Sequence, residues 1–354
     1  MKIVSPFLKK VVYPSLSSAG IFHRASGSGL AVVTYHGVVP EGYQAIDAGL
    51  DGNLVTADVL RQQLRLLKTR YSVITPEDAL AWREGQCNLP RNAVLVTCDD
   101  GLLNHLTDML PVLREEGVKS LFFVTGASAG EERTMLWYEE LLLLFLRAPV
   151  GRYEVSCDGV AIDVELSLRE QRRAVWWNSV KRLSQNARSR TSFIQAARER
   201  FGVNPLAELG VENGATCRRF GLLTRNELLA LASAGMTIGA HTMSHPMLSQ
   251  LPANSAREEI VECRAQLESA LHSRVWAFAY PFGDAQSVTP QILAIPAEVG
   301  YAAAFLNYGG GLGVDLPPYA VPRIHVTAEM SLAEFEAHIS GFYAGLQRRA
   351  GRSA

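Results

Sequence analysis

Short apolar runs and amphipathic stretches alternate along most of the chain. The runs Leu30–Thr34, Ala93–Thr97 and Leu121–Thr125 predict buried strands, because a strand covered on both faces is apolar throughout. The stretches between them have apolar residues three and four positions apart, which predicts helices. Further strands are expected at Val73–Ile74, Met236–Ala240, Val275–Ala279, Tyr301–Leu306 and Ala320–Val326. Repeated strand-then-helix order predicts a parallel α/β fold, either open or closed into a barrel.

Several expected helices carry start signals in their sequence. Thr75 is followed three residues later by Asp78, and Thr224 is followed in the same way by Glu227. Each pair predicts a capping box, in which two side chains satisfy backbone N–H groups at the helix start. Ser331 is expected to cap the last helix.

Residues 131–220 break this rhythm, with a helix expected at 136–147, a hairpin at 153–165 and then two helices. The segment from Arg169 to Arg200 contains nine Lys or Arg residues and two acidic ones, together with Trp176 and Trp177. We favour a solvated helix face with both tryptophans turned to the core. The alternative is a basic, aromatic surface for an anionic polymer or a membrane. We predict a barrel of residues 30–130 and 221–347, interrupted by an insertion at 131–220.

Residues 1–29 are expected to form a leader segment. Lys9 and Lys10 precede an uncharged, weakly apolar stretch from Val11 to Phe22 that contains Pro14. A signal peptide needs a compact apolar core and a small-residue cleavage site, so it is the less favoured interpretation. We favour an amphipathic segment that packs on the domain or makes peripheral contact with a membrane.

Composition narrows the class of protein only slightly. A net charge of -1 creates no overall field that would attract nucleic acid, so no nucleic-acid partner is predicted. The five cysteines are scattered, without a C-x-x-C pair, which argues against a disulfide framework. These features favour a cytoplasmic or membrane-associated protein and leave export open. The oligomeric state is not indicated.

The first stretch with candidate catalytic or metal-binding residues is Thr97-Cys98-Asp99-Asp100-Gly101, which lies between an apolar strand and a helix. Ligands of parallel α/β folds bind at the carboxyl ends of strands, where this stretch is expected. Two adjacent carboxylates there need a compensating positive charge, which a divalent cation would supply. A helix-capping aspartate is the alternative interpretation.

A second stretch, His241-Thr242-Met243-Ser244-His245, also follows a predicted strand. Histidines four residues apart on a turn can reach one ion. Two histidines and one aspartate leave coordination positions open for water or substrate, as catalytic metal sites do. Zinc is the favoured metal, and cobalt, nickel, iron or manganese would also fit these ligands.

These two stretches resemble the polysaccharide deacetylase family, also called the NodB-homology or carbohydrate esterase family 4 group. Its motifs read T-F-D-D-G and H-[ST]-x-x-H, and Cys98 replaces the phenylalanine of the first. The resemblance implies an irregular (β/α) barrel of about seven parallel strands, here with a helical and hairpin insertion. It also implies that Asp99 is the catalytic base and that Asp100, His241 and His245 are the metal ligands.

A third family motif, R-x-P-[YW]-G, aligns with Ala279-Tyr280-Pro281-Phe282-Gly283, so its arginine is missing here. The family arginine positions and tunes the base, and Arg323 could supply the lost charge instead. The resemblance places the Phe282 backbone N–H as an oxyanion donor, and Tyr280, Pro281 and Gly283 beside the substrate.

Two further histidines are candidates by the same resemblance. His325 follows an apolar strand and would be the general acid, although a polar residue at a strand end is an alternative interpretation. Tyr35-His36 resembles a motif of deacetylases from exopolysaccharide pathways and would place His36 near the site. A strand-end histidine with a local hydrogen bond is the alternative.

The resemblance implies a hydrolase of non-peptide C–N bonds that removes acetyl groups from an N-acetylated glycan. A related hydrolase of a small cyclic amide is the first alternative. A non-catalytic glycan-binding protein that retains the motifs is the second, and the missing motif-three arginine favours it.

Overall fold

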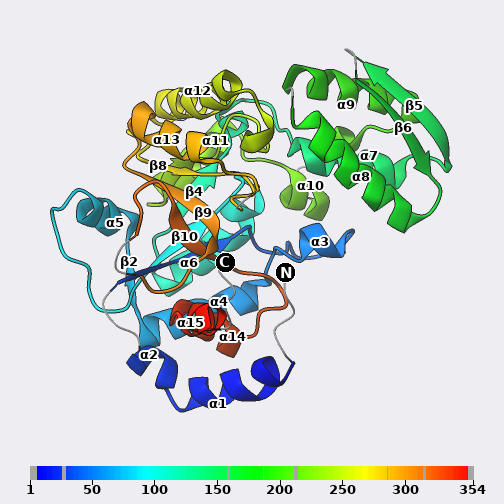
Figure 1. The fold of residues 1–354 in the computed structure, drawn as a ribbon. Helices are drawn as coiled ribbons and strands as arrows, with labels where there is room; N and C mark the ends of the chain where they lie inside the picture. Colours follow the sequence, from blue (N-terminus) through cyan, green and yellow to red (C-terminus); the bar gives the residue numbers. More distant parts are fainter. Residues whose placement is uncertain are drawn as a thin grey trace.

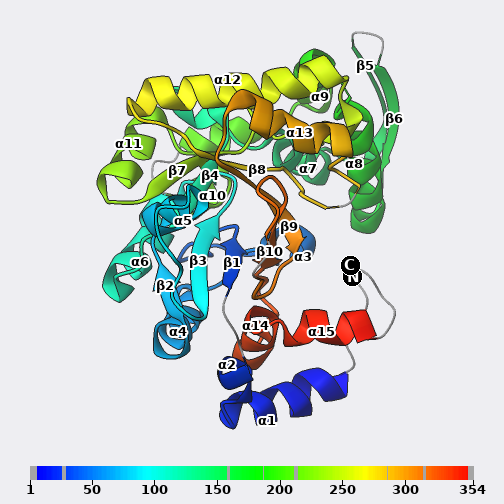
Figure 2. The same cartoon turned by 60° about the vertical axis from the view of Figure 1, so that its left-hand side comes forward.

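Seven parallel strands close into a barrel in the computed structural model (Figures 1 and 2). The structure describes residues 6–25, 29–157, 160–185, 187–210, 214–284, 286–313 and 316–349. The strand order is β1-β10-β9-β8-β7-β4-β3, and β3 pairs back with β1 to close the ring. The short β2 (Ser72–Ile74) pairs with the first half of β3. The barrel strands are β1 (Leu30–Tyr35), β3 (Ala93–Cys98), β4 (Leu121–Val124), β7 (Thr237–Ala240), β8 (Ala277–Ala279), β9 (Ala303–Gly309) and β10 (Val321–His325). The predicted irregular (β/α) barrel is confirmed.

Alternate residues of these strands fill the barrel interior, because successive side chains of a strand point to opposite faces. Phe123 and Phe305 meet there with ring centroids 5.2 Å apart. Gly239 of β7 leaves space for them, since a Cβ at that position would lie 2.6 Å from the Phe123 ring. The interior is therefore a packed core, and ligands can enter only at its ends.

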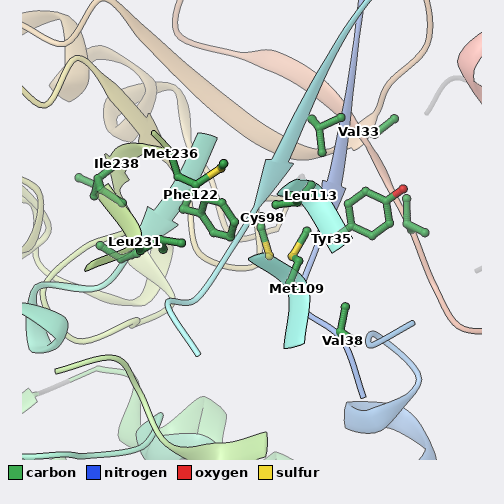
Figure 3. Close-up of a cluster of buried hydrophobic side chains, with 14 of the residues drawn as sticks. Val33, Tyr35, Val38, Cys98, Met109, Leu113, Phe122, Leu231, Met236 and Ile238 are labelled. Carbon is green, nitrogen blue, oxygen red and sulfur yellow. The ribbon is translucent and has the colours of Figure 1, made fainter. Parts of the chain in front are cut away.

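The other face of each strand packs against the surrounding helices (Figure 3). Thr75 with Asp78 and Thr224 with Glu227 form the predicted capping boxes at two helix starts. After β3 a π-helical turn (His105–Met109) comes before the regular helix, in which Pro111 lacks an N–H for the hydrogen-bond ladder. These helices are α4 (Ala57–Arg70), α5 (Pro76–Arg83), α6 (Leu110–Glu116), α11 (Arg225–Ser233), α12 (Ala253–Leu271) and α13 (Pro290–Val299).

Residues 131–220 lie to one side of the barrel and share a hydrophobic cluster that includes Phe145, Trp176 and Phe193 (Figure 1). The hairpin is antiparallel, and two helices follow it, as expected. The division into leader, barrel and insertion stays a prediction. The elements are α7 (Trp137–Arg147), β5 (Gly151–Cys157), β6 (Val160–Leu166), α8 (Arg169–Leu183), α9 (Ala187–Phe201) and α10 (Ala215–Phe220).

The N-terminal helices pack beneath the barrel against α14 (Leu332–Ile339), on which Tyr13 and Phe22 are buried. They are the π-helical turn Leu8–Val12, α1 (Tyr13–Ser18) and α2 (Ile21–Ala25). Ser331 caps α14 as predicted, but α14 is not the last helix. Gly341 adopts φ +74° after it, and α15 (Phe342–Arg349) follows. Among the described residues, every helix is too short or too polar to cross a bilayer.

Candidate active site

A pocket of about 470 Å³ opens at the carboxyl ends of the barrel strands. Its lining includes seven residues that the sequence singled out from five different strand ends: His36, Asp99, Asp100, His241, His245, Phe282 and His325. Most of the remaining lining comes from the insertion and from the short helix α3 (Ala48–Asp51) with the residues just after it.

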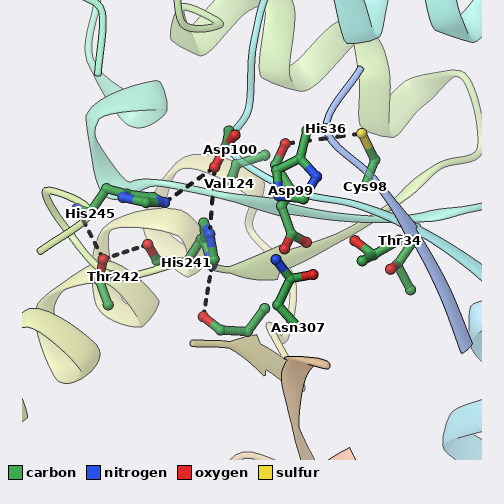
Figure 4. Close-up of polar contacts among 12 residues, drawn as sticks. Thr34, His36, Cys98, Asp99, Asp100, Val124, His241, Thr242, His245 and Asn307 are labelled. Atoms are coloured by element: carbon green, nitrogen blue, oxygen red, sulfur yellow. Dashed lines mark hydrogen bonds and ion pairs between the residues drawn. The ribbon is translucent and has the colours of Figure 1, made fainter. Parts of the chain in front are cut away.

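Asp100, His241 and His245 converge on one point in this pocket (Figure 4). Nε2 of His241 lies 3.6 Å from Asp100 Oδ1, and Nε2 of His245 lies 3.3 Å from the same oxygen. The three ligand atoms are within 4.8 Å of one another. Burial acts to raise the pKa of Asp100, but its interactions with His241 and His245 outweigh this effect and hold that pKa well below its usual value.

The ligand atoms of this triad suit a divalent cation. His241 Nδ1 lies 2.7 Å from the Ala279 carbonyl oxygen, which can only accept a hydrogen bond. The proton of a neutral His241 is therefore on Nδ1, and the Nε2 lone pair faces Asp100 and His245. Two imidazoles and one ionised carboxylate are a usual catalytic zinc set, with at least one position left open.

The loop that carries the two histidines is positioned by the insertion and by α12. The Trp137 indole N–H donates to the His245 carbonyl over 3.0 Å, and Arg190 donates to the Ser244 hydroxyl over 2.5 Å. Glu259 accepts from both Ser244 groups, its backbone N–H at 2.9 Å and its hydroxyl at 2.5 Å. No local sequence signal points to Trp137 or Arg190, because they precede this loop by more than 50 residues.

Backbone strain is concentrated at the pocket. Six described residues other than glycine have positive φ, and four of them are Asp100 (+88°), Thr242 (+64°), His245 (+54°) and Phe282 (+61°). Such conformations cost about 1–3 kcal/mol each and persist where the surroundings fix them. Here the surroundings include the hydrogen bond from the His245 N–H to Thr242 Oγ1, 3.0 Å long.

Asp99 is paired with Arg323, not with an arginine on β8. The guanidinium donates Nη1 to Asp99 Oδ1 over 2.7 Å and Nη2 to Oδ2 over 2.5 Å, and both residues are almost fully buried. Burial acts to raise the pKa of Asp99, but the Arg323 charge, followed by that of His241, lowers it below its usual value. Ala279, where the family has arginine, is fully buried among the residues of the barrel interior.

Arg323 is itself fixed by neighbours from three other strands. It donates Nε to the Leu306 carbonyl over 2.7 Å, and Nη1 to the hydroxyls of Thr34 and Thr97 over 3.1 and 3.2 Å. The guanidinium lies below the pocket floor, so its contact is with Asp99 and not with the cavity.

His36 and His325 both line the pocket and lie against each other, with ring centroids 4.6 Å apart. Asn307 Nδ2 is 3.5 Å from His325 Nδ1. Burial, together with His36, lowers the pKa of His325 to about 3, so its ring is neutral near pH 7. His325 Nε2 is buried and has no hydrogen-bond partner among the described residues.

The motif-three stretch is divided between the core and the pocket. Tyr280 is buried in the outer core and donates its hydroxyl to the Tyr319 carbonyl over 2.9 Å, while Pro281 is also buried. Phe282 lines the pocket and contacts the His245 ring at a centroid distance of 5.1 Å. Gly283 allows a close approach of β9, because a Cβ would lie 2.6 Å from the Asn307 backbone nitrogen.

The insertion contributes pocket residues that the sequence did not single out, namely Tyr138, Glu139, Arg173 and Arg219. Arg219 is buried and bridges Asp51 of α3 and Glu139 of α7, over 2.8 and 2.9 Å. The favoured interpretation of the tryptophans holds for Trp176, which is 4% exposed. It fails for Trp177, which is 38% exposed and lines the pocket, as Trp176 also does.

Known proteins show the same architecture. The Streptococcus pyogenes deacetylase PplD, solved in complex with acetate, is 16% identical to this chain. The structural alignment covers 89% of this chain and 99% of PplD, with a TM-score of 0.55. For IcaB from Ammonifex degensii, which is 19% identical, the alignment covers 88% of this chain and 97% of IcaB, with a TM-score of 0.53. At these identities the likeness is one of fold.

Sequence comparison gives the family. The Bacillus subtilis (strain 168) protein YxkH is 26% identical over 117 residues, which are 33% of this chain and 41% of that relative, so the match spans less than half of YxkH. The family model described as polysaccharide deacetylase matches residues 87–304, more than half of the chain and a range that includes both Asp100 and His245. The chain therefore belongs to the polysaccharide deacetylase family.

Proposed function

We propose that this protein is a metal-dependent hydrolase that removes acetyl groups from an N-acetylated glycan and releases acetate. One observation carries the proposal: an ionised carboxylate, Asp99, adjoins the Asp100–His241–His245 triad in one pocket. A buried base next to a cation site is the arrangement that metal-assisted amide hydrolysis needs. The Tyr35-His36 pair favours a substrate from the exopolysaccharides.

Asp100, His241 and His245 would hold the divalent cation. Zinc is the metal we favour from this ligand set, and cobalt, nickel, iron or manganese are compatible with it. When bound, such an ion lowers the pKa of water and polarises a carbonyl oxygen.

Asp99 would take the proton from the attacking water. The bidentate pair with Arg323 keeps it ionised and fixes its orientation, so it is ready to accept a proton near neutral pH. The backbone N–H of Phe282, which lines the pocket beside His245, would donate to the oxyanion that forms from the acetyl carbonyl.

His325 would deliver a proton to the leaving amine. Because its ring is neutral in the free protein, that proton must reach it during the reaction. The group that acquires one is Asp99, after it deprotonates water. His36, packed against His325, is placed to orient the ring for this transfer.

Metal analysis of the purified protein combined with an acetate-release assay on N-acetylglucosamine oligosaccharides tests the proposal. We expect about one bound divalent ion per chain and acetate release that a chelator abolishes. Hydrolysis of a cyclic amide without acetate release would replace the substrate class. Glycan binding with neither metal nor turnover would indicate the non-catalytic alternative, which the Asp99–Arg323 pair argues against because it supplies the charge missing at Ala279.

A further inference from the structure

The pocket has an aromatic wall that continues from the metal triad to the pocket mouth, and all of it except Phe282 comes from the insertion. Tyr138 lies against His245 with ring centroids 5.2 Å apart, and against Phe282 at 6.0 Å. Trp176 donates its indole N–H to the Tyr138 carbonyl over 2.6 Å. Trp177 follows at the mouth, with its ring centroid 5.6 Å from that of Trp176.

The outer end of this wall is open to a ligand. Trp176 is buried and its polar N–H is satisfied, whereas more than a third of Trp177 is exposed. Lys181 lies over the Trp177 ring, 5.8 Å from its centroid, which adds a cation beside the exposed indole. An exposed tryptophan that lines a concave pocket has apolar surface that the fold does not cover.

Polar groups stand beside the aromatic wall. Arg173, Trp176 and Trp177 occupy positions i, i+3 and i+4 of α8, so they share one helix face, and that face lines the pocket. The Arg173 guanidinium packs on Gly49 of α3, where a Cβ would lie 1.8 Å from Nη2, and it is 3.6 Å from Asp47. It is half-exposed and therefore has N–H donors for a ligand.

Glu139 offers an acceptor in the same pocket. Its Oε1 accepts from Arg219, but its Oε2 is buried and has no hydrogen-bond partner among the described residues. The side chain is only 4% exposed, and the residue lines the cavity. A buried carboxylate oxygen without a partner is costly, and a hydroxyl group of a ligand would satisfy it.

We propose that Trp177, Arg173 and Glu139 form a second sugar-binding subsite, which holds a pyranose ring next to the one that is deacetylated. This inference rests on the proposed function. The C–H face of a pyranose is apolar and would lie on the indole, whose π face carries partial negative charge. The ring hydroxyls would donate to Glu139 and accept from Arg173. The substrate is accordingly a glycan chain of at least two sugars.

The subsite can be tested by binding, independently of turnover. The Asp99→Asn protein is titrated with N-acetylglucosamine and with its β-linked dimer to hexamer, and Kd is read by calorimetry. We expect the hexamer to bind about tenfold or more tightly than the monomer, since tenfold needs only about 1.4 kcal/mol. Adding Trp177→Ala should remove this gain and leave monomer affinity unchanged. Trp177→Phe should keep part of it.

Val150→Ala is the matched control, because Val150 is an exposed apolar residue of the same insertion that does not line this pocket. Equal hexamer affinity with and without Trp177, or no dependence on chain length, would overturn the subsite. An equal loss for monomer and hexamer would also overturn it, since it indicates a structural role. Acetate release by the wild-type protein tests the proposed function separately: binding without release would remove only that function.

Discussion

The two sides of the pocket are built differently. On the barrel side the groups are charged, buried and fixed by several contacts each, as Asp99 is by Arg323 and as the triad is by its mutual contacts. On the insertion side three of the six pocket residues are aromatic, namely Tyr138, Trp176 and Trp177, and Trp177 and Arg173 are partly exposed. Groups that transfer protons or bind metal need fixed geometry, whereas groups that recognise a polymer need area. On the roles proposed above, the chemistry therefore belongs to the barrel and the recognition to the insertion.

Removing Asp100 should have the largest effect. Asp100→Ala deletes the carboxylate between His241 and His245, so bound metal and acetate release should both be lost, with turnover reduced by about 10³-fold or more. Metal analysis and the acetate assay measure this. Asp163→Asn, an exposed carboxylate on the insertion, is the control and should change neither. An Asp100→Ala protein with full metal content would place the cation elsewhere.

Asp99→Asn should separate the base from the metal site. The amide keeps the size of the side chain but cannot take a proton, so turnover should fall by about 10²–10⁴-fold with metal content unchanged. Steady-state kinetics and metal analysis on the same preparation check this. Turnover close to that of the wild type would exclude Asp99 as the base.

Moving the arginine from β10 to β8 tests how much the ion pair between Arg323 and Asp99 contributes to stability and activity. Arg323→Ala leaves Asp99 as an unpaired buried charge and should destabilise the fold by about 3–5 kcal/mol, with most activity lost. Denaturant unfolding measures the first effect. Adding Ala279→Arg should restore part of both, because the charge returns from the interior position where the family motif has its arginine. Unchanged stability in Arg323→Ala would show that the pair is not needed for the fold.

The smallest effect is expected from removing the hydrogen bond by which the insertion positions the histidine loop. Trp137→Phe keeps an aromatic ring but removes the N–H that donates to the His245 carbonyl. Groups that orient metal ligands typically affect metal affinity about 10–100-fold, and a backbone contact should lie at the lower end. Competition with a chelator of known affinity measures this. An unchanged affinity would strengthen the division of roles between barrel and insertion, and a larger loss would weaken it.

The fold and the centre of the site were accessible from the sequence because their signals are local. Continuous apolar runs indicated the barrel strands, and Asp99-Asp100 and His241–His245 each lie within five residues at a strand end. Parallel strands bring such ends together wherever they stand in the chain. The meeting of Asp100 with both histidines followed from that rule.

Contacts between distant segments were less accessible. Arg323 was a candidate for the missing charge, and only the closed barrel shows that it reaches Asp99, 224 residues away. Trp177 belongs to a basic helix whose amphipathic pattern is weak, so its exposure depends on how α8 packs against α7 and faces α3. Trp137 and Arg190 carry no motif at all. Their roles arise from tertiary contacts with the histidine loop.

The left-handed residues around the pocket set a limit on engineering this protein. Glycine at Thr242, His245 or Phe282 would relax the backbone, and asparagine at Asp100 would tolerate the same conformation. A selection for heat resistance alone would thus favour replacements at Asp100 and His245, which we propose bind metal, at Phe282, which lines the cavity, and at Thr242, which lies between the two histidines. Thermostable variants should be sought among surface helices remote from these loops, with the four residues kept constant.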